Sequence, residues 1–171
     1  MVVGARGVGK TYGIMKYCIE HKIPFIYLRR LKTQLELCAS VQGNPFNKLN
    51  ADMGMNIKPQ NTRAGVVFAD GDTVVALGVA LSTVANVRGF DYSQYNMIIF
   101  DEAIASEGER PISKEFNVFL NFYETVNRNR ELTGSAAVKA VLLGNANRLT
   151  NPYFSGWHFM KTALNMIKGN Q

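Results

Sequence analysis

The sequence predicts an α/β fold in which a mainly parallel sheet is flanked by helices and extended at one edge by an antiparallel hairpin. The first observation is a strand, a helix and a strand in succession over Val2-Val3, Lys10–His21 and Pro24–Leu28, an order that forms a right-handed crossover between parallel strands. The second is a set of short, nearly continuous apolar runs, typical of strands buried on both faces. The third is a pair of apolar segments joined by a glycine-containing turn, which favours a hairpin.

The first strand leads into Gly4–Thr11, which fits the phosphate-binding pattern Gly-x-x-x-x-Gly-Lys-[Ser/Thr] at every fixed position. The glycines let several backbone N–H groups point at one anion, and the N-terminus of the next helix also favours anions. Lys10 adds a charge for the outer phosphates of ATP, and the Thr11 hydroxyl is a ligand for Mg²⁺. Arg6 either senses the phosphates or a neighbouring carboxylate, or is an exposed loop charge. A chance glycine-rich turn is the alternative, which the flanking strand and helix disfavour. The expected nucleotide-binding residues are Gly4, Arg6, Gly7, Gly9, Lys10 and Thr11.

The second strand ends at Arg29-Arg30, and a helix is expected over about Lys32–Ala39. The stretch from Gly43 to Gln60 contains Gly, Asn and Pro, so we interpret it as a loop or excursion. Ala64–Ala69 and Thr73–Gly78 then form the expected hairpin, which extends one edge of the sheet.

The apolar run Asn96–Phe100 ends at two adjacent carboxylates, Asp101 and Glu102. A buried strand that ends in this pair matches the Walker B pattern, in which Asp101 holds Mg²⁺ through water or Thr11 and Glu102 orients and deprotonates the attacking water. The alternative is a pair of carboxylates on an ordinary solvated strand end. Because the pair follows a phosphate-binding pattern, we favour the catalytic interpretation. A polar loop follows, from Ala105 to Arg110.

A helix is predicted over about Lys114–Asn127, with a core-facing stripe at three- and four-residue steps. We interpret the aromatic residues of this stripe as packing and not as a base-stacking surface. The stripe consists of Phe116, Phe119, Leu120, Tyr123 and Val126.

Arg128 and Arg130 follow the helix. A guanidinium there can protrude toward a neighbouring subunit's ATP, or it can simply compensate the helix dipole.

Another strand, Val138–Leu143, leads to Asn145. The Asn145 amide reaches the γ-phosphate or the water if this strand lies beside the first one. The alternative is an asparagine that closes a turn. The last helix is expected over about Trp157–Ile167.

The composition indicates a single domain over residues 1–171, because 171 residues that are 47% apolar can bury one core. The net charge of +6 favours an anionic partner, although part of the basic surplus serves the nucleotide. Cys18 and Cys38 are expected to be free thiols in a reducing cytosol. We expect no membrane span and no signal peptide, hence a soluble intracellular protein. Few residues precede Gly4, so sequence is expected to be missing upstream.

Taken together, these motifs resemble one family, the ATPase domain of the genome-packaging (encapsidation) ATPases of small short-tailed phages with protein-capped linear DNA. The resemblance covers the whole chain, and the joint order of the motifs is more specific than any one of them. The Arg88-Gly89 pair also resembles the large terminases, which are more distant packaging motors. The matching stretches are Gly4–Thr11, Phe25–Lys32, Ile99–Glu102, Thr125–Glu131 and Asn151–Phe154.

The resemblance implies an ATPase that drives double-stranded DNA into an empty capsid. It implies a homo-oligomeric ring, usually of five subunits, at the capsid portal in the host cytoplasm, with an RNA adaptor in some members. It also implies a P-loop NTPase sheet of ASCE type, in which the Asn145 strand lies between those that lead to Lys10 and Asp101. A C-terminal nuclease-like domain follows in the family, so residues 1–171 are expected to be an ATPase domain fragment.

The resemblance also assigns roles to residues. Lys10 and Thr11 serve phosphate and Mg²⁺, Asp101 serves Mg²⁺, and Glu102 serves catalysis. Arg128 acts on the neighbour's ATP, a basic residue at Arg88 acts between subunits, and the segment around Lys32 faces DNA. One departure is Gly144, since relatives often place a hydroxyl there. The chain therefore offers no side-chain hydroxyl at this position.

Two other functions fit a phosphate loop. A P-loop kinase of a small acceptor needs a mobile lid with arginines and no glutamate poised on water, so the Asp101-Glu102 pair disfavours it. A nucleotide-gated module that does not hydrolyse ATP is the third possibility, and turnover of ATP distinguishes it.

Overall fold

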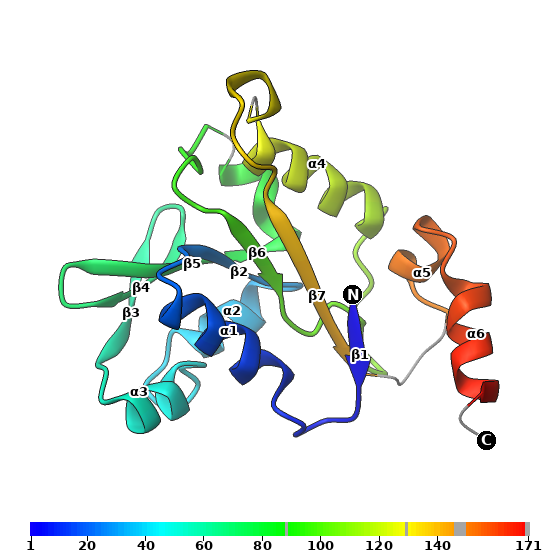
Figure 1. The fold of residues 1–171 in the computed structure, drawn as a ribbon, viewed down its shortest axis with the longest axis horizontal. Coiled ribbons are helices and arrows are strands. Elements are labelled where there is room, and N and C mark those ends of the chain that lie inside the picture. The colour runs from blue at the N-terminus through cyan, green and yellow to red at the C-terminus, as the bar shows by residue number, and fades with distance from the viewer. Residues whose placement is uncertain (88, 129, 146–149, 170–171) are drawn as a thin grey trace.

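The computed structural model describes residues 1–87, 89–128, 130–145 and 150–169. Its centre is a seven-stranded sheet in the order β1-β7-β6-β2-β5-β4-β3 (Figure 1). The strands from β1 through β5 in this order run parallel, and β4 and β3 add antiparallel pairs at one edge. The strands are β1 (Val2–Gly4), β2 (Phe25–Arg29), β3 (Ile57–Thr62), β4 (Gly65–Asp70), β5 (Thr73–Ala80), β6 (Met97–Phe100) and β7 (Lys139–Asn145).

Two layers of helices cover the sheet. The first three helices pack on one face, and α4 and α5 pack on the other. The helices are α1 (Lys10–Glu20), α2 (Lys32–Cys38), α3 (Asn47–Met53), α4 (Glu115–Asn127), α5 (Pro152–Gly156) and α6 (Met160–Gly169), with 3₁₀ turns η1 (Leu81–Val87) and η2 (Glu131–Thr133). None of these helices, within the described ranges, combines the length and apolar character needed to cross a bilayer.

The buried strands send alternate side chains to opposite faces. In β2, Phe25 and Tyr27 join the core beneath α1 and α2, whereas Ile26 and Leu28 join the core beneath α4. All four are at most 1% exposed, which explains why the run reads as continuously apolar. The predicted mixed sheet, with a hairpin at one edge, is therefore confirmed.

The structure corrects the expected loop from Gly43 to Gln60. This stretch contains α3 and the start of β3. The strand was missed because only its first residue, Ile57, is buried and because Pro59 lies within it. An edge strand tolerates proline because its outer side needs no N–H donor.

Two smaller expectations also change. The helix predicted over about Trp157–Ile167 begins later, at Met160, as α6, and a separate helix that was not predicted, α5, precedes it, with His158 in a left-handed conformation between the two. The aromatic residues of α4 do pack into the core, as predicted, but the buried apolar residues of this helix are Phe119, Phe122 and Val126. Phe119 contacts the rings of Phe100 and Tyr153, so this stripe is a packing surface. Cys18 and Cys38 are buried free thiols, as expected.

Candidate functional site

The Gly4–Thr11 loop, the end of β6 and the end of β7 meet at one cavity of about 470 Å³. The carboxyl ends of the parallel strands β1, β7 and β6 share this edge of the sheet, as the strand order requires. The sequence prediction that these three segments come together is thus confirmed. The lining residues are Arg6, Gly7, Val8, Gly9, Lys10, Thr11, Tyr12, Asp101, Glu102, Leu143, Gly144 and Asn145.

The loop curls through two glycines with positive φ, Gly7 at 77° and Gly9 at 79°. Residues with a side chain are strained in this conformation, whereas glycine adopts it freely. Gly9 is also the residue before α1, and no side chain caps this helix end. The N–H groups of the first turn are therefore left for an anion in the cavity.

The Lys10 side chain lies against the backbone of the Gly4–Thr11 loop. Its Nζ donates to the carbonyl oxygens of Gly4 at 3.0 Å and Ala5 at 2.6 Å, and it lies 3.4 Å from Oδ1 of Asn145. Asn145 is the last residue of β7, which lies between β1 and β6. The sequence expectation that the Asn145 strand occupies this position is confirmed.

Gly144 precedes this asparagine, and its lack of a side chain has a local cause. A Cβ at Gly144 would lie 2.7 Å from Cδ1 of Ile104. Ile104 is buried and follows the carboxylate pair by two positions. The departure from the resemblance thus makes room for a side chain that packs the loop after β6 against β7.

Asp101 is tied to the Gly4–Thr11 loop by a hydrogen bond. The Thr11 hydroxyl donates to Asp101 Oδ1 at 2.7 Å. The second carboxylate oxygen accepts from the Tyr27 hydroxyl at 2.7 Å and from Arg29 Nη1 at 2.9 Å. Burial, reinforced by the charge of Asp101, raises the pKa of Tyr27 well above its ordinary value, so the phenol remains a donor. A hydroxyl and an oriented carboxylate therefore lie side by side in the cavity.

Glu102 has a backbone φ of 51°, which is unusual for a residue with a side chain. Its carboxylate oxygen Oε2 accepts a hydrogen bond from Nη2 of Arg29 at 2.5 Å. Non-glycine residues in this region store strain, and such residues cluster at functional sites. The side chain is 41% exposed, so it faces the open cavity and not the core.

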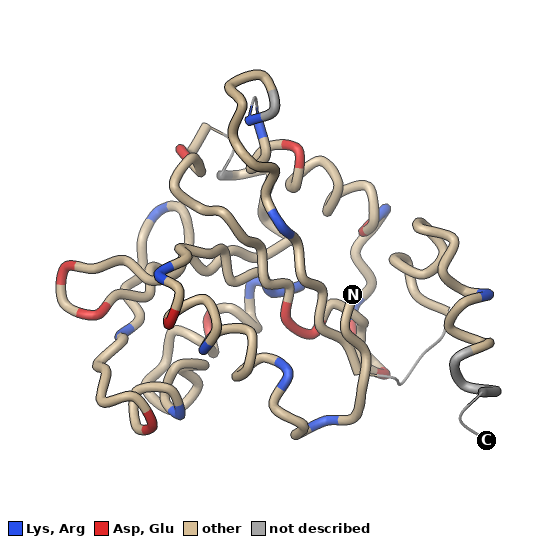
Figure 2. Tube along the Cα trace, in the orientation of Figure 1, with Lys and Arg blue, Asp and Glu red and all other residues tan. Residues whose placement is uncertain are grey.

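Arg29 is a site residue that the sequence did not identify as a partner of the carboxylates. Burial opposes its charge, but Tyr27, Asp101 and Glu102 together raise the pKa of its guanidinium above the ordinary value. Leu28 pairs with Phe100 in the parallel register of β2 and β6, so the next residues, Arg29 and Asp101, end side by side. Figure 2 shows basic and acidic segments of the trace together where these two strands end. No pattern within one segment reveals this register.

The neighbouring Arg30 has a different environment, because it is 1% exposed and lies on the other face of the sheet. It makes a bidentate pair with Glu115, with both N–O distances 2.8 Å. A further pair joins it to Glu109 at 2.5 Å, and the Tyr153 hydroxyl donates to Glu115 at 3.0 Å. This network ties the end of β2 to the loop before α4 and to α5.

The remaining predicted residues lie outside the cavity or at its rim. Arg6 donates to the Ser106 hydroxyl at 3.4 Å and is exposed. Lys32 begins α2, is 67% exposed, and pairs with Glu36 at 3.6 Å. Arg88 lies outside the described residues.

Arg128 and Arg130 line a second cavity of about 770 Å³ at the other end of β6. Arg130 donates to Asn96 Oδ1 and to the carbonyl oxygens of Ser93 and Tyr95, each at 2.7 Å. Arg130 is thus bound within its own chain, which argues against a protruding role. Arg128 is exposed, and its side chain makes no hydrogen bond or ion pair with another described residue.

The positions of the two cavities bear on how Arg128 can act. Asn96 stands directly before β6 and Asp101 directly after it, so the arginines and the carboxylates lie at opposite ends of this strand. Four strand residues span roughly 13 Å, too far for a guanidinium to reach the carboxylate end in its own chain.

Comparison with known proteins gives a consistent result. The family model described as podovirus DNA encapsidation protein (Gp16) matches residues 1–166. The DNA packaging protein of Bacillus phage phi29 is 33% identical over 158 residues, which cover 90% of this chain and 44% of that protein. The chain therefore spans less than half the length of this relative.

The solved structures that resemble the chain include two from bacteriophage phi29. The N-terminal domain of the DNA packaging ATPase from bacteriophage phi29 has a TM-score of 0.73 at 29% identity, covering 92% of this chain and 78% of that one. The bacteriophage phi29 viral genome packaging motor assembly has a TM-score of 0.72 at 28% identity, covering 92% of this chain and 46% of that one.

Proposed function

The chain belongs to the podovirus DNA encapsidation protein family, and from this membership we propose that it is a P-loop ATPase domain of ASCE type that moves double-stranded DNA into a capsid. The observation that carries the proposal is the 2.7 Å hydrogen bond from Thr11 to Asp101. It joins a phosphate-binding loop to a carboxylate pair in one cavity, and hydrolysis of a nucleoside triphosphate needs both.

The donor set fits Mg²⁺. This ion takes oxygen ligands and is usually held by one or two carboxylates together with substrate phosphates. Thr11 and Asp101 offer a hydroxyl and a carboxylate oxygen in contact, so they are the residues that would hold it. When bound, the ion neutralises charge on the phosphate oxygens of ATP.

The other residues have roles that follow from their positions. The N–H groups at the start of α1 and the Lys10 ammonium bind the phosphates, with Gly4, Gly7 and Gly9 giving the loop its shape. The Glu102 carboxylate orients a water molecule and accepts its proton, while the Asn145 amide orients the water or the γ-phosphate. Arg6 stands at the rim, where it meets the phosphates or remains a loop charge.

We further propose that catalysis needs a second subunit. Arg128 lies away from its own carboxylates but is exposed, so it can serve the ATP of a neighbour in a ring. Arg88 is a further candidate between subunits. The structure described as the phi29 viral genome packaging motor assembly supports an assembly of several chains, for which a ring of five subunits is the expectation. The ring acts at the capsid portal in the host cytoplasm, with DNA against Lys32 and with an RNA adaptor in the assembly.

The experiment that tests the proposal is ATP turnover by the chain, with and without double-stranded DNA, at a concentration that permits assembly. Release of inorganic phosphate, stimulated by DNA, is expected. Glu102→Gln should bind ATP but hydrolyse it at least ~10²-fold more slowly, because the amide keeps the shape and loses the base. Phosphate transfer to a small acceptor, or binding without turnover, would replace the motor by a kinase or a non-hydrolysing module.

A further inference from the structure

Tyr12, the residue after Thr11 in α1, lines the phosphate cavity although the sequence patterns gave it no role. Its hydroxyl donates to Oδ2 of Asp52 at 2.8 Å. Asp52 is in α3, the helix that was expected to be a loop. The ammonium of Lys48 lies 5.4 Å from the centre of the Tyr12 ring and 3.4 Å from Asp52. The ring is therefore held in place by two residues of α3.

These contacts persist at neutral pH. The hydrogen bond from Tyr12 lowers the pKa of Asp52 below its ordinary value, with a further contribution from the charge of Lys48. The same hydrogen bond raises the pKa of Tyr12. Carboxylate and phenol thus keep the protonation states that the bond requires.

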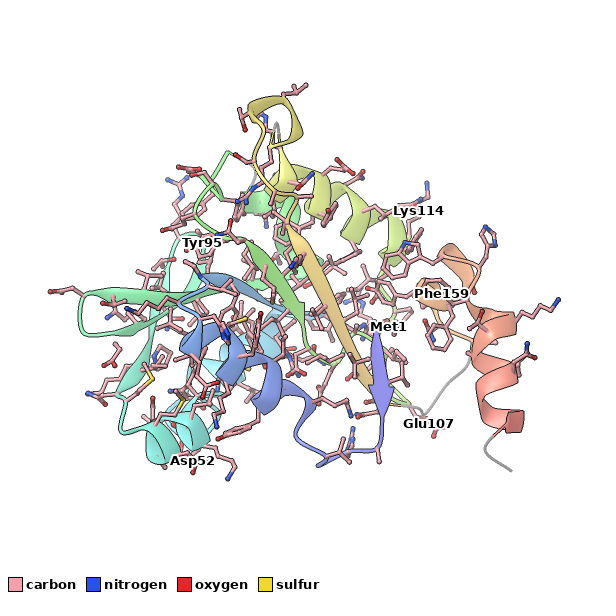
Figure 3. The ribbon with its side chains drawn as sticks, viewed as in Figure 1. Met1, Asp52, Tyr95, Glu107, Lys114 and Phe159 are labelled. Atoms are coloured by element: carbon pink, nitrogen blue, oxygen red, sulfur yellow. The ribbon has the colours of Figure 1, made fainter. Side chains whose placement is uncertain are left out.

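The two ends of the cavity differ in chemistry. Glu102 and Asn145 mark the end at which the γ-phosphate is expected, at the tips of β6 and β7. α3 lies along α1 on the side away from β7, and Figure 3 labels Asp52 on that helix (Figures 1 and 3). Tyr12 is thus on the flank of the phosphate loop that faces α3, away from Asn145 at the end of β7. Val8, which is 63% exposed, adds apolar surface to the same cavity.

We propose that the ring of Tyr12, anchored by Asp52 of α3, is the surface on which the base of the bound nucleotide stacks. The inference rests on the proposed nucleotide site. Every base offers a flat π-face that can stack on an aromatic side chain, so stacking depends little on which base is bound. A ring that is already held by a hydrogen bond loses little conformational freedom when it receives the base. α3 then has a function, since it orients this ring.

A purely structural role for Tyr12 makes a different prediction. If the ring only fastens α1 to α3, its loss disturbs the loop between them and the phosphates themselves bind less well. If the ring stacks on the base, its loss leaves phosphate binding intact. The affinity for ATP relative to inorganic tripolyphosphate, which has no base, therefore separates the two roles.

The experiment measures the dissociation constants of ATP and of tripolyphosphate by calorimetry, with Mg²⁺ present. Tyr12→Leu keeps the apolar packing and removes the aromatic face, so it should weaken ATP binding by about tenfold, the order expected for stacking on one ring, and leave tripolyphosphate within about twofold. Tyr12→Phe keeps the ring and should stay within about threefold for both ligands. Tyr17→Leu is the matched control, because Tyr17 is an exposed tyrosine of the same helix that stacks on His21.

Each outcome has a defined meaning. Equal weakening of both ligands by Tyr12→Leu, or no weakening of ATP, overturns the stacking role while the nucleotide site stands. Failure of the unaltered chain to bind either ligand overturns the proposed function and this inference with it. If Tyr12→Leu does not fold, Tyr12→Met replaces it, because it also keeps an apolar side chain without an aromatic face, and a loss confined to ATP again supports the inference.

Discussion

Nη2 of Arg29 lies 2.5 Å from Oε2 of Glu102, although 73 positions separate the two residues in the chain. The same guanidinium holds Asp101 through Nη1 at 2.9 Å. One buried cation thus fixes both carboxylates of the candidate site. Its Nε is buried without a hydrogen-bond partner among the described residues, so the two charge pairs and a 3.5 Å hydrogen bond from Nη1 to the Tyr27 hydroxyl hold the group.

Arg29→Ala should lower the turnover number for ATP at least ~10-fold and change the KM for ATP by less than about threefold, because the carboxylates lose their orientation while the phosphate loop is untouched. Steady-state kinetics measure the split. Arg63→Ala, which removes an exposed arginine of the β3–β4 turn, is the control and should change neither constant. An Arg29→Ala variant with full turnover would show that Glu102 needs no partner.

Arg30→Met should lower the free energy of unfolding by about 3–5 kcal/mol, because it leaves Glu115 buried without its cation. Denaturant titration measures the change. Replacing both residues, as Arg30→Met with Glu115→Leu, should recover part of the loss, since it removes the buried charge that the single variant strands. Lys16→Ala breaks an exposed pair with Glu20 and should cost about 0–1 kcal/mol. A single variant as stable as the double variant would contradict the network.

Catalysis through Arg128 of a neighbour predicts complementation between inactive variants. Arg128→Ala and Glu102→Gln should each lose ~10²-fold or more in turnover when assembled alone. Mixed rings should regain part of the activity, because some interfaces pair an intact Glu102 with an intact Arg128. Phosphate release from mixtures over a range of ratios tests this. No recovery beyond the two parents in assembled rings would leave Arg88 or Arg6 as the next candidate, since Arg130 is bound within its own chain.

If Lys32 contacts DNA, replacing it should weaken DNA binding by the same amount for every DNA sequence. Lys32→Ala should lower affinity for duplex DNA and reduce the slope of log affinity against log salt by about 1, because one phosphate contact is lost. Fluorescence anisotropy at several salt concentrations measures both. Lys16→Ala is matched to it, since Lys16 is also an exposed helix lysine with a partner four residues on. Equal effects of the two substitutions would show only a change of net charge.

The sequence by itself determined the features that depend on neighbouring residues. The glycines and Lys10-Thr11 define the predicted phosphate-binding pattern of Gly4–Thr11, and the structure places Gly7 and Gly9 at the positive φ that the pattern requires. The apolar runs marked the buried strands for the same reason, because a strand buried on both faces has no polar position. Asp101, Glu102 and Asn145 could be located because each ends such a run.

Only the tertiary structure decided which of these ends lie together and what else joins them. Arg29 meets Glu102 because β2 and β6 pair in a particular parallel register, and that register is set by burial of side chains far apart in the chain. Arg128 and Arg130 look alike in sequence. Arg130 is nevertheless bound to the loop before β6 by hydrogen bonds, whereas Arg128 is exposed. Tyr12 acquires its anchor only when α3 packs beside α1. Local patterns carry no information on such long-range contacts, because the contacts form when the whole core is buried.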